Sequence, residues 1–461
     1  MPIVNPRAEL RAQYQLTRDS YTGQGNFANG GYLYQYEREV DFAQRQDMAS
    51  YTNFVKPIVD ARVNPVFVSE PNRTYDNEIV DLFLKNCDNN ETSLTKYIHK
   101  ATTETVLLGN SFIVMDNFPE NEIPETLNQV IEDRKFPYIY SKSVLDVYEY
   151  KTDIFNKLEE ITFYYGLYEW DGEDEVYLYK RFTKDDIEYF ILKEEEDDDG
   201  TVKTAKTVIS TTVNELGRVP VAYDNKDILP MAPYYSMASL ARNMYNTDSE
   251  LKDLSRSQMF SILLIPSINP TADSQDNIVI SNSNAIFYDS QSTNTPEYIS
   301  PDSSIMTVQM ENRSKQIENL LSTADVLGSS VVNKGTSASS GVAMSYEFFG
   351  QMYALLESSN IASNLEEQVI EILGLYLDTE IEYYTEYPRE FSPTFNETQQ
   401  KINALNDVVK MNISEEVSIE MNKSIVKLLG EQMEIEPETL TVLVDSVVSL
   451  DTEVITDTEV E

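Results

Sequence analysis

Residues 235–264 have the sequence YSMASLARNMYNTDSELKDLSRSQMFSILL. The less polar positions recur at helical spacing: Met237, Leu240, Ala241, Met244, Leu251 and Leu254. Charged residues occupy much of the remainder, so the spacing predicts one long amphipathic helix. Because proline cannot continue a helix, we expect Pro266 and Pro270 to stop it.

A small insertion and a second helix follow. Residues 266–303 hold two strand candidates, Ile278–Ile280 and Ala285–Tyr288, among Asn, Ser and Asp turn residues. The second helix is expected at 304–327 with an apolar stripe: Ile305, Val308, Ile317, Leu320, Leu321 and Ala324. Two long helices around a β insertion predict an antiparallel hairpin with a cap.

The next stretch, 328–341, is rich in Gly and Ser and has Lys334 as its one charge. Its part Gly335–Gly341 could be mistaken for a phosphate-cradling loop, but it follows no strand and lacks the Gly-Lys-Ser/Thr ending. We therefore expect a loop between helices. A helix then resumes at Val342 and is expected to reach Tyr384, with a kink at Gly374.

The segment before the hairpin predicts an α+β fold. Helices are expected around Phe54–Ile58, at Asp76–Lys85 and at Ser93–Leu108, the last with Ser93 as N-cap and Gly109 as stop. Ser111–Asp116 and several later runs with period two predict strands of an antiparallel sheet: Tyr138–Tyr140, Val144–Tyr150, Ile161–Tyr165, Val176–Tyr179, Ile187–Leu192 and Thr207–Thr212. A Gly/Tyr/Asn-rich arm from Tyr21 to Tyr36 precedes them.

The C-terminal part predicts short helices at 397–411, 414–429 and 437–450. The last eleven residues, 451–461, contain acids and no basic residue, and we expect them to be disordered.

The composition of the chain argues against several classes of function. The 461 residues include 78 Asp and Glu against 35 Lys and Arg, a formal net charge of −43, which disfavours tight binding of DNA phosphates. No apolar run is long enough to cross a bilayer, and the first six residues do not have the pattern of a signal peptide. A single cysteine, Cys87, excludes an intramolecular disulfide and fits a reducing compartment.

Candidate catalytic and metal groups are few. The single histidine, His99, is expected on the polar side of a helix without the partners that a triad or a zinc site needs. The acidic run Glu194–Asp199 lacks the spacing of a calcium loop, and we interpret it as a solvated hairpin tip. We expect no enzyme activity, no metal and no cofactor.

The order of these elements resembles the portal proteins of tailed bacteriophages. Tyr245-Asn246-Thr247-Asp248-Ser249-Glu250-Leu251 is similar to the "YN..S.L" pattern of portal chains. Gly341-Val342-Ala343, after Ser339-Ser340, is similar to the "SG.A" element that follows the portal tunnel loop. Phe395-Asn396-Glu397 and Ile413-Ser414-Glu415-Glu416 resemble the family's C-terminal pattern.

The resemblance implies a division of the chain into a wing, a stem, a clip, a tunnel loop and a crown. The parts are the wing at 1–234, the first stem helix at 235–265, the clip at 266–303, the second stem helix at 304–327, the tunnel loop at 328–341, the long wing helix at 342–390, the helical crown at 391–450 and the acidic tail at 451–461.

It also implies site residues. Those of the tunnel loop are Gly328, Val331, Asn333, Lys334, Gly335, Ser337 and Gly341. Those of the clip, whose acids leave a negative rim for a partner with a basic face, are Asp273, Asp276, Asp289 and Glu297. Those of the stem are Tyr245, Asn246, Ser249, Leu251, Ile317 and Leu320.

The function implied is a portal: a dodecameric ring at one capsid vertex, assembled in the host cytoplasm. Double-stranded DNA would pass through it without tight binding during genome packaging and ejection. The implied partners are the terminase motor, the major capsid and scaffold proteins, and the neck or adaptor proteins. Another structural virion component, a connector or minor capsid protein, is the alternative.

Overall fold

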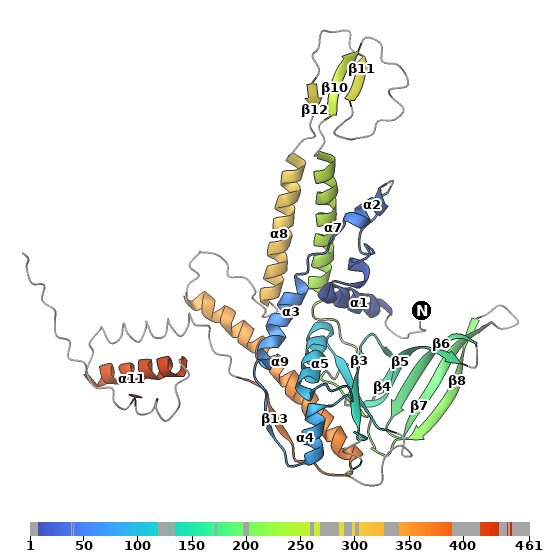
Figure 1. Ribbon diagram of the computed structural model, residues 1–461, viewed down its shortest axis with the longest axis vertical. Helices are drawn as coiled ribbons and strands as arrows, with labels where there is room; N and C mark the ends of the chain where they lie inside the picture. Colours follow the sequence, from blue (N-terminus) through green and yellow to red (C-terminus); the bar gives the residue numbers. More distant parts are fainter. Residues whose placement is uncertain are drawn as a thin grey trace, which may run out of the picture. The chain divides into compact units, whose positions relative to one another are not determined.

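The computed structural model describes residues 8–37, 39, 41–118, 129, 134–170, 173–196, 202–258, 262–267, 285–289, 297–299, 304–326, 341–389, 415–432, 440 and 443–444. Helices and sheets are both present, so the fold is α+β, as predicted (Figure 1). The chain divides into two compact units, residues 1–389 and residues 390–461, and each is described by itself.

The N-terminal part of the first unit is mainly helical. Its elements are α1 (Ala8–Thr22), η1 (Gly25–Phe27), α2 (Phe42–Met48), α3 (Val55–Val63), η2 (Asn64–Phe67), β1 (Asn72–Thr74), α4 (Glu78–Lys85) and α5 (Leu94–Leu108). The predicted limits of α5 are confirmed: the Ser93 hydroxyl accepts a hydrogen bond from the Lys96 amide, and Gly109 takes a left-handed conformation at φ +92°.

The strands form two antiparallel sheets where the sequence predicted one. The smaller has the order β3-β2-β9, made of Tyr138–Ser143, Ser111–Asp116 and Val221–Ala222. The larger has the order β4-β5-β6-β7-β8, made of Val147–Thr152, Leu158–Trp170, Glu173–Thr183, Asp186–Glu196 and Val202–Val213. Phe112 and Phe163 contact between them at a centroid distance of 5.4 Å.

The predicted continuous strand Val144–Tyr150 is wrong at its start. Residues 144–146 form a turn that separates β3 from β4. Asp146 closes the turn, because its amide donates to the Ser143 carbonyl at 2.9 Å and its carboxylate accepts from the Ser143 amide at 2.9 Å. Local side-chain bonding of this kind competes with strand pairing, and the chain changes sheet here.

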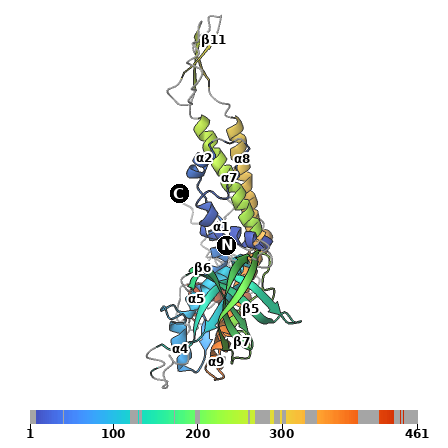
Figure 2. The ribbon, with the colours of Figure 1, turned by 90° about the vertical axis from the view of Figure 1, so that its right-hand side faces the viewer.

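The long helices form the predicted hairpin. Helix α7 (Tyr235–Gln258) packs along α8 (Ser304–Val326), and the chain between them forms the sheet β11-β10-β12 in Figures 1 and 2. Its strands are Ala285–Asp289, Ile262–Ser267 and Glu297–Ile299. The strand predicted at Ala285–Tyr288 is confirmed, whereas the one predicted at Ile278–Ile280 lies outside the described residues.

The first long helix is shorter than predicted. It ends at Gln258, and Ile262–Ile265, expected to be helical, belong to β10. Pro266 pairs with Tyr288 in a parallel register instead of stopping a helix. Among the described residues, β12 pairs with Ile262–Leu264 and does not reach Pro266, which fits the preference of proline for positions without a ladder partner on one side.

Helix α9 (Gly341–Tyr376) also ends earlier than the predicted Tyr384. Gly374 does not kink it; the chain turns back so closely that a Cβ on Gly374 would lie 2.9 Å from the Thr379 carbonyl oxygen. Asp378 adopts φ +48°, and residues 384–386 then form β13, which pairs antiparallel with β1. A tight backbone approach, and not a bend, is therefore the reason for the glycine.

In the second unit, α11 (Glu415–Gln432) occupies the position of the helix predicted at 414–429. The helix predicted at 397–411 and the tail at 451–461 lie outside the described residues, as does most of 437–450. Among the described helices, none combines the length and apolar character that a membrane span requires.

Candidate functional site: the hairpin and its arm

The two hairpin helices are joined by polar contacts. The Arg313 guanidinium on α8 pairs with the Asp248 carboxylate on α7, with Nε–Oδ1 at 2.5 Å and Nη2–Oδ2 at 3.3 Å. Nearby, the Gln316 amide donates to the Thr247 hydroxyl at 3.1 Å. A two-point pairing of guanidinium and carboxylate fixes orientation as well as distance, so these contacts set the register of the two helices.

Apolar packing holds the opposite end of α8. Leu320, a predicted stem residue, is fully buried, and Ala324 one turn later is buried too. Ile317 is half-buried. The predicted stripe is therefore confirmed in its C-terminal half.

The stripe has a different environment in its N-terminal half. Ile305, Val308 and Met310 are 55%, 55% and 53% exposed. On a helical wheel Ile305 and Val308 lie on one flank of the α7-facing side of α8, and Met310 lies on the other. Three large apolar side chains thus face solvent within two turns of one helix.

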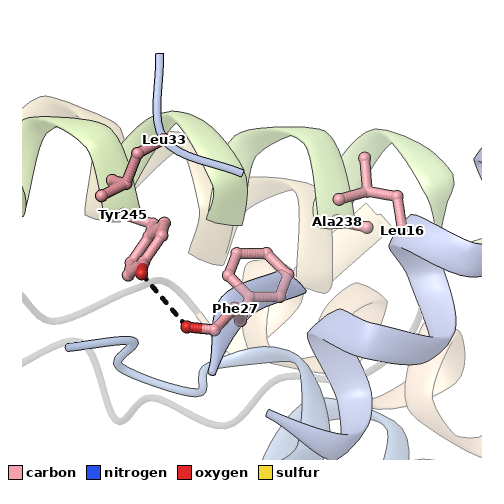
Figure 3. Packing of buried hydrophobic residues seen from close by; sticks show 5 residues of the cluster. All are labelled: Leu16, Phe27, Leu33, Ala238 and Tyr245. Atoms are coloured by element: carbon pink, nitrogen blue, oxygen red, sulfur yellow. Dashed lines mark hydrogen bonds between the residues drawn. The ribbon is translucent and has the colours of Figure 1, made fainter. Parts of the chain in front are cut away.

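The arm lies along α7. In the structure it comprises residues 23–51 without 38 and 40 and is longer than the arm predicted at Tyr21–Tyr36. Tyr245 and Asn246, both predicted stem residues, contact it directly. The Tyr245 hydroxyl donates to the Phe27 carbonyl at 3.1 Å. Leu16, Phe27, Leu33, Ala238 and Tyr245 form one buried cluster, as Figure 3 shows (Figure 3).

Asn246 binds the arm through both ends of its amide. Its Nδ2 donates to the Tyr32 carbonyl at 3.0 Å, and its Oδ1 accepts from the Tyr34 amide at 2.7 Å. The side chain thereby replaces the peptide group of a neighbouring strand. Of the other predicted stem residues on α7, Ser249 is buried and Leu251 is half-buried.

The end of the arm is bound by charged groups that the sequence analysis missed. Arg45 is buried and pairs with Glu39 at 2.6 Å, and it also donates to the Tyr34 carbonyl. The Tyr36 hydroxyl donates to Glu250 on α7, and this bond raises the pKa of the tyrosine. The predicted part of the arm, Tyr21–Tyr36, has no helical or strand period, so only its aromatic content signalled a packing role.

A second buried network joins α9 to β1 and β13. The Glu366 carboxylate is fully buried and accepts two bonds of 2.8 Å from Arg73. The hydroxyls of Tyr383 and Tyr387 donate to the same carboxylate at 2.5 and 2.6 Å. Local sequence patterns did not indicate this network, because Arg73 lies 293 positions from Glu366.

His99 has a structural environment. Its Nε2 lies 2.9 Å from Asn64 Oδ1, and its ring packs edge-on to Phe67 at 4.7 Å. Burial lowers the pKa of the imidazole. In the part of the chain that the structure describes, no group of three or more His, Cys, Asp or Glu side chains is placed to hold a metal ion.

The other predicted site residues are only partly within the structure. Gly341 is the first residue of α9, Asp289 ends β11, and Glu297 begins β12. The remaining tunnel-loop and clip residues lie outside the described ranges: Gly328, Val331, Asn333, Lys334, Gly335, Ser337, Asp273 and Asp276.

Among solved structures, the chain is similar to a chain of the virion of a native gene transfer agent particle. The TM-score is 0.37 at 10% sequence identity, and the match covers 92% of this chain and 95% of that chain. No family model matches the sequence, and no curated protein does. We therefore base the function on the chain's own residues.

Proposed function

We propose that this chain is the subunit of a portal ring in a virion, through which double-stranded DNA is packaged and ejected. It would be a structural protein and not an enzyme. The observation that carries the proposal is the hairpin of α7 and α8 with the sheet β11-β10-β12 between the helices, followed by α9. The stem, clip and long wing helix of the portal resemblance have this order.

The surface of α8 supports assembly. An exposed set of Ile305, Val308 and Met310 costs free energy in water and is typical of a surface that another protein covers. In a ring, the hairpin of each subunit is covered by its neighbours, so exposed apolar residues on α8 are expected. A solitary subunit would leave them in water.

The net negative charge of the chain supports a role as a channel for DNA. A chain with a formal net charge of −43 repels the DNA phosphates, so DNA would slide past without being held. The clip would bind the terminase motor first and the neck or adaptor proteins later. The wing would contact the major capsid and scaffold proteins.

Electron microscopy of the negatively stained, purified full-length chain separates this proposal from the alternative of a connector or minor capsid protein. A portal subunit gives rings with a central hole, and addition of the cognate terminase decorates one end of them. Shell fragments or sheets would favour the alternative. Discrete particles of monomer size would contradict both.

A further inference from the structure

The arm and α8 lie on opposite sides of α7. On a helical wheel, the midpoint of the arm-contacting residues Tyr245 and Asn246 lies about 160° from the midpoint of Thr247 and Asp248, which contact α8. Figures 1 and 2 agree, since α2 packs on α7 and not on α8 in either view. The hairpin therefore has two unlike sides.

Both sides expose apolar or aromatic side chains. The arm presents Tyr34 and Tyr36, which are 46% and 52% exposed although their backbone or hydroxyl groups are bound to α7. The α8 side presents Val308 and its exposed neighbours. Arg242 lies over the Tyr34 ring at 5.5 Å and Arg45 over the Tyr36 ring at 5.4 Å, and both tyrosines still expose about half of their surface.

The two sides also carry opposite charges at the same height. The Asp248–Arg313 pair fixes the height of one helix against the other. Lys252 lies four residues beyond Asp248 along α7, about 6 Å closer to the sheet β11-β10-β12. Glu311 lies two residues before Arg313 along α8, about 3 Å closer to the same sheet. Both side chains are exposed. Within the described residues neither has an ion-pair partner; Lys252 binds only the Met48 carbonyl and the Ser50 hydroxyl.

We propose that the arm side of one copy receives the α8 side of the next copy, with Lys252 facing Glu311 across the interface. The inference rests on the proposed ring. In a cyclic ring, each subunit contacts the next through two unlike surfaces. When the rotation axis of the ring runs parallel to the hairpin, these two surfaces must lie at the same position along the axis. The arm would then be a ring contact, and Asn246 the residue that holds it in position.

Charge reversal tests the pairing in the full-length chain. Lys252→Glu and Glu311→Lys should each raise the protein concentration at half-assembly by about tenfold or more, because like charges then meet. The double variant should return it towards the wild-type value. Lys157→Glu and Glu215→Lys, two exposed residues away from the hairpin, are the matched controls and should assemble normally.

Cross-linking tests the geometry independently. Lys252→Cys and Glu311→Cys chains, each prepared separately, should be joined by a short dimaleimide only after the two are mixed. The native Cys87 is buried and burial raises its pKa to about 12, so it should not compete. Rings that form without this cross-link, and that tolerate both reversals, would overturn the interface while leaving the portal proposal intact. Absence of any ring would overturn both.

Discussion

Asn246 on α7 and Tyr34 in the arm are 212 positions apart in the sequence and 2.7 Å apart at the side-chain oxygen and the amide nitrogen. The same side chain donates to the Tyr32 carbonyl. One amide therefore satisfies a donor and an acceptor of a segment that is neither helix nor strand. Few other side chains offer both groups in this geometry.

Asn246→Asp should detach the arm. The carboxylate has no N–H for the Tyr32 carbonyl and would place a negative oxygen against it, leaving a buried acceptor without a donor. We expect a loss of about 1–3 kcal/mol in the free energy of unfolding. Hydrogen exchange should accelerate at residues 32–36, while Asn243→Asp, an exposed change on the same helix, should leave both measurements unchanged.

The buried Arg73–Glu366 pair should be the costliest to break. Glu366→Gln keeps the shape of the side chain but leaves the Arg73 cation with less compensation in a buried site. We expect a destabilisation of about 3 kcal/mol or more in urea unfolding. Glu367→Gln changes the exposed neighbour and is the control; an equal effect of both variants would mean that the buried pair contributes little.

The same carboxylate predicts a pH dependence. Burial alone would raise the pKa of Glu366, but the hydrogen bonds and charge of Arg73 outweigh it and hold the pKa below its ordinary value. The contribution of the Glu366 carboxylate to the free energy of unfolding is therefore complete above about pH 4.3, the pKa of Glu in the unfolded chain. It is lost as the pH falls through the pKa of Glu366 in the folded chain. Between about pH 6 and about pH 3, the wild type should lose more stability than Glu366→Gln. Parallel slopes would contradict this assignment.

The loop at 328–341 gives a functional prediction. Lys334 is its one charge, so Lys334→Glu should alter DNA retention or packaging while rings still form. DNA release from filled particles measures the effect, with Lys157→Glu as the control. If Lys334→Glu instead prevented ring formation, the loop would be a subunit contact.

Elements with strong local signals could be predicted from the sequence. The cap at Ser93, the stop at Gly109, strand β2 and the hairpin helices depend on neighbouring residues, and the structure has them. The end of α7 could not be predicted, because the Ile262–Ile265 run suits a helix or a strand and pairing with β11 decides between them.

The candidate site was predictable only in part. Tyr245 and Asn246 stood out through the portal resemblance, but their partners in the arm have no periodic pattern and are more than two hundred positions away. The Arg73–Glu366 pair could not be predicted either, because its two residues are also far apart in the sequence. Long-range polar contacts depend on the packing of whole elements, which a local pattern does not contain.

The most direct test of the account is the assembly state of the purified chain at low micromolar concentration, measured by light scattering and by images of the same sample. A portal subunit should form a closed ring with a central hole, and the chain should be loosely folded or poorly soluble when Val308→Asp and Ile305→Asp prevent assembly. A stable, fully folded monomer that stays monomeric at high concentration would contradict it.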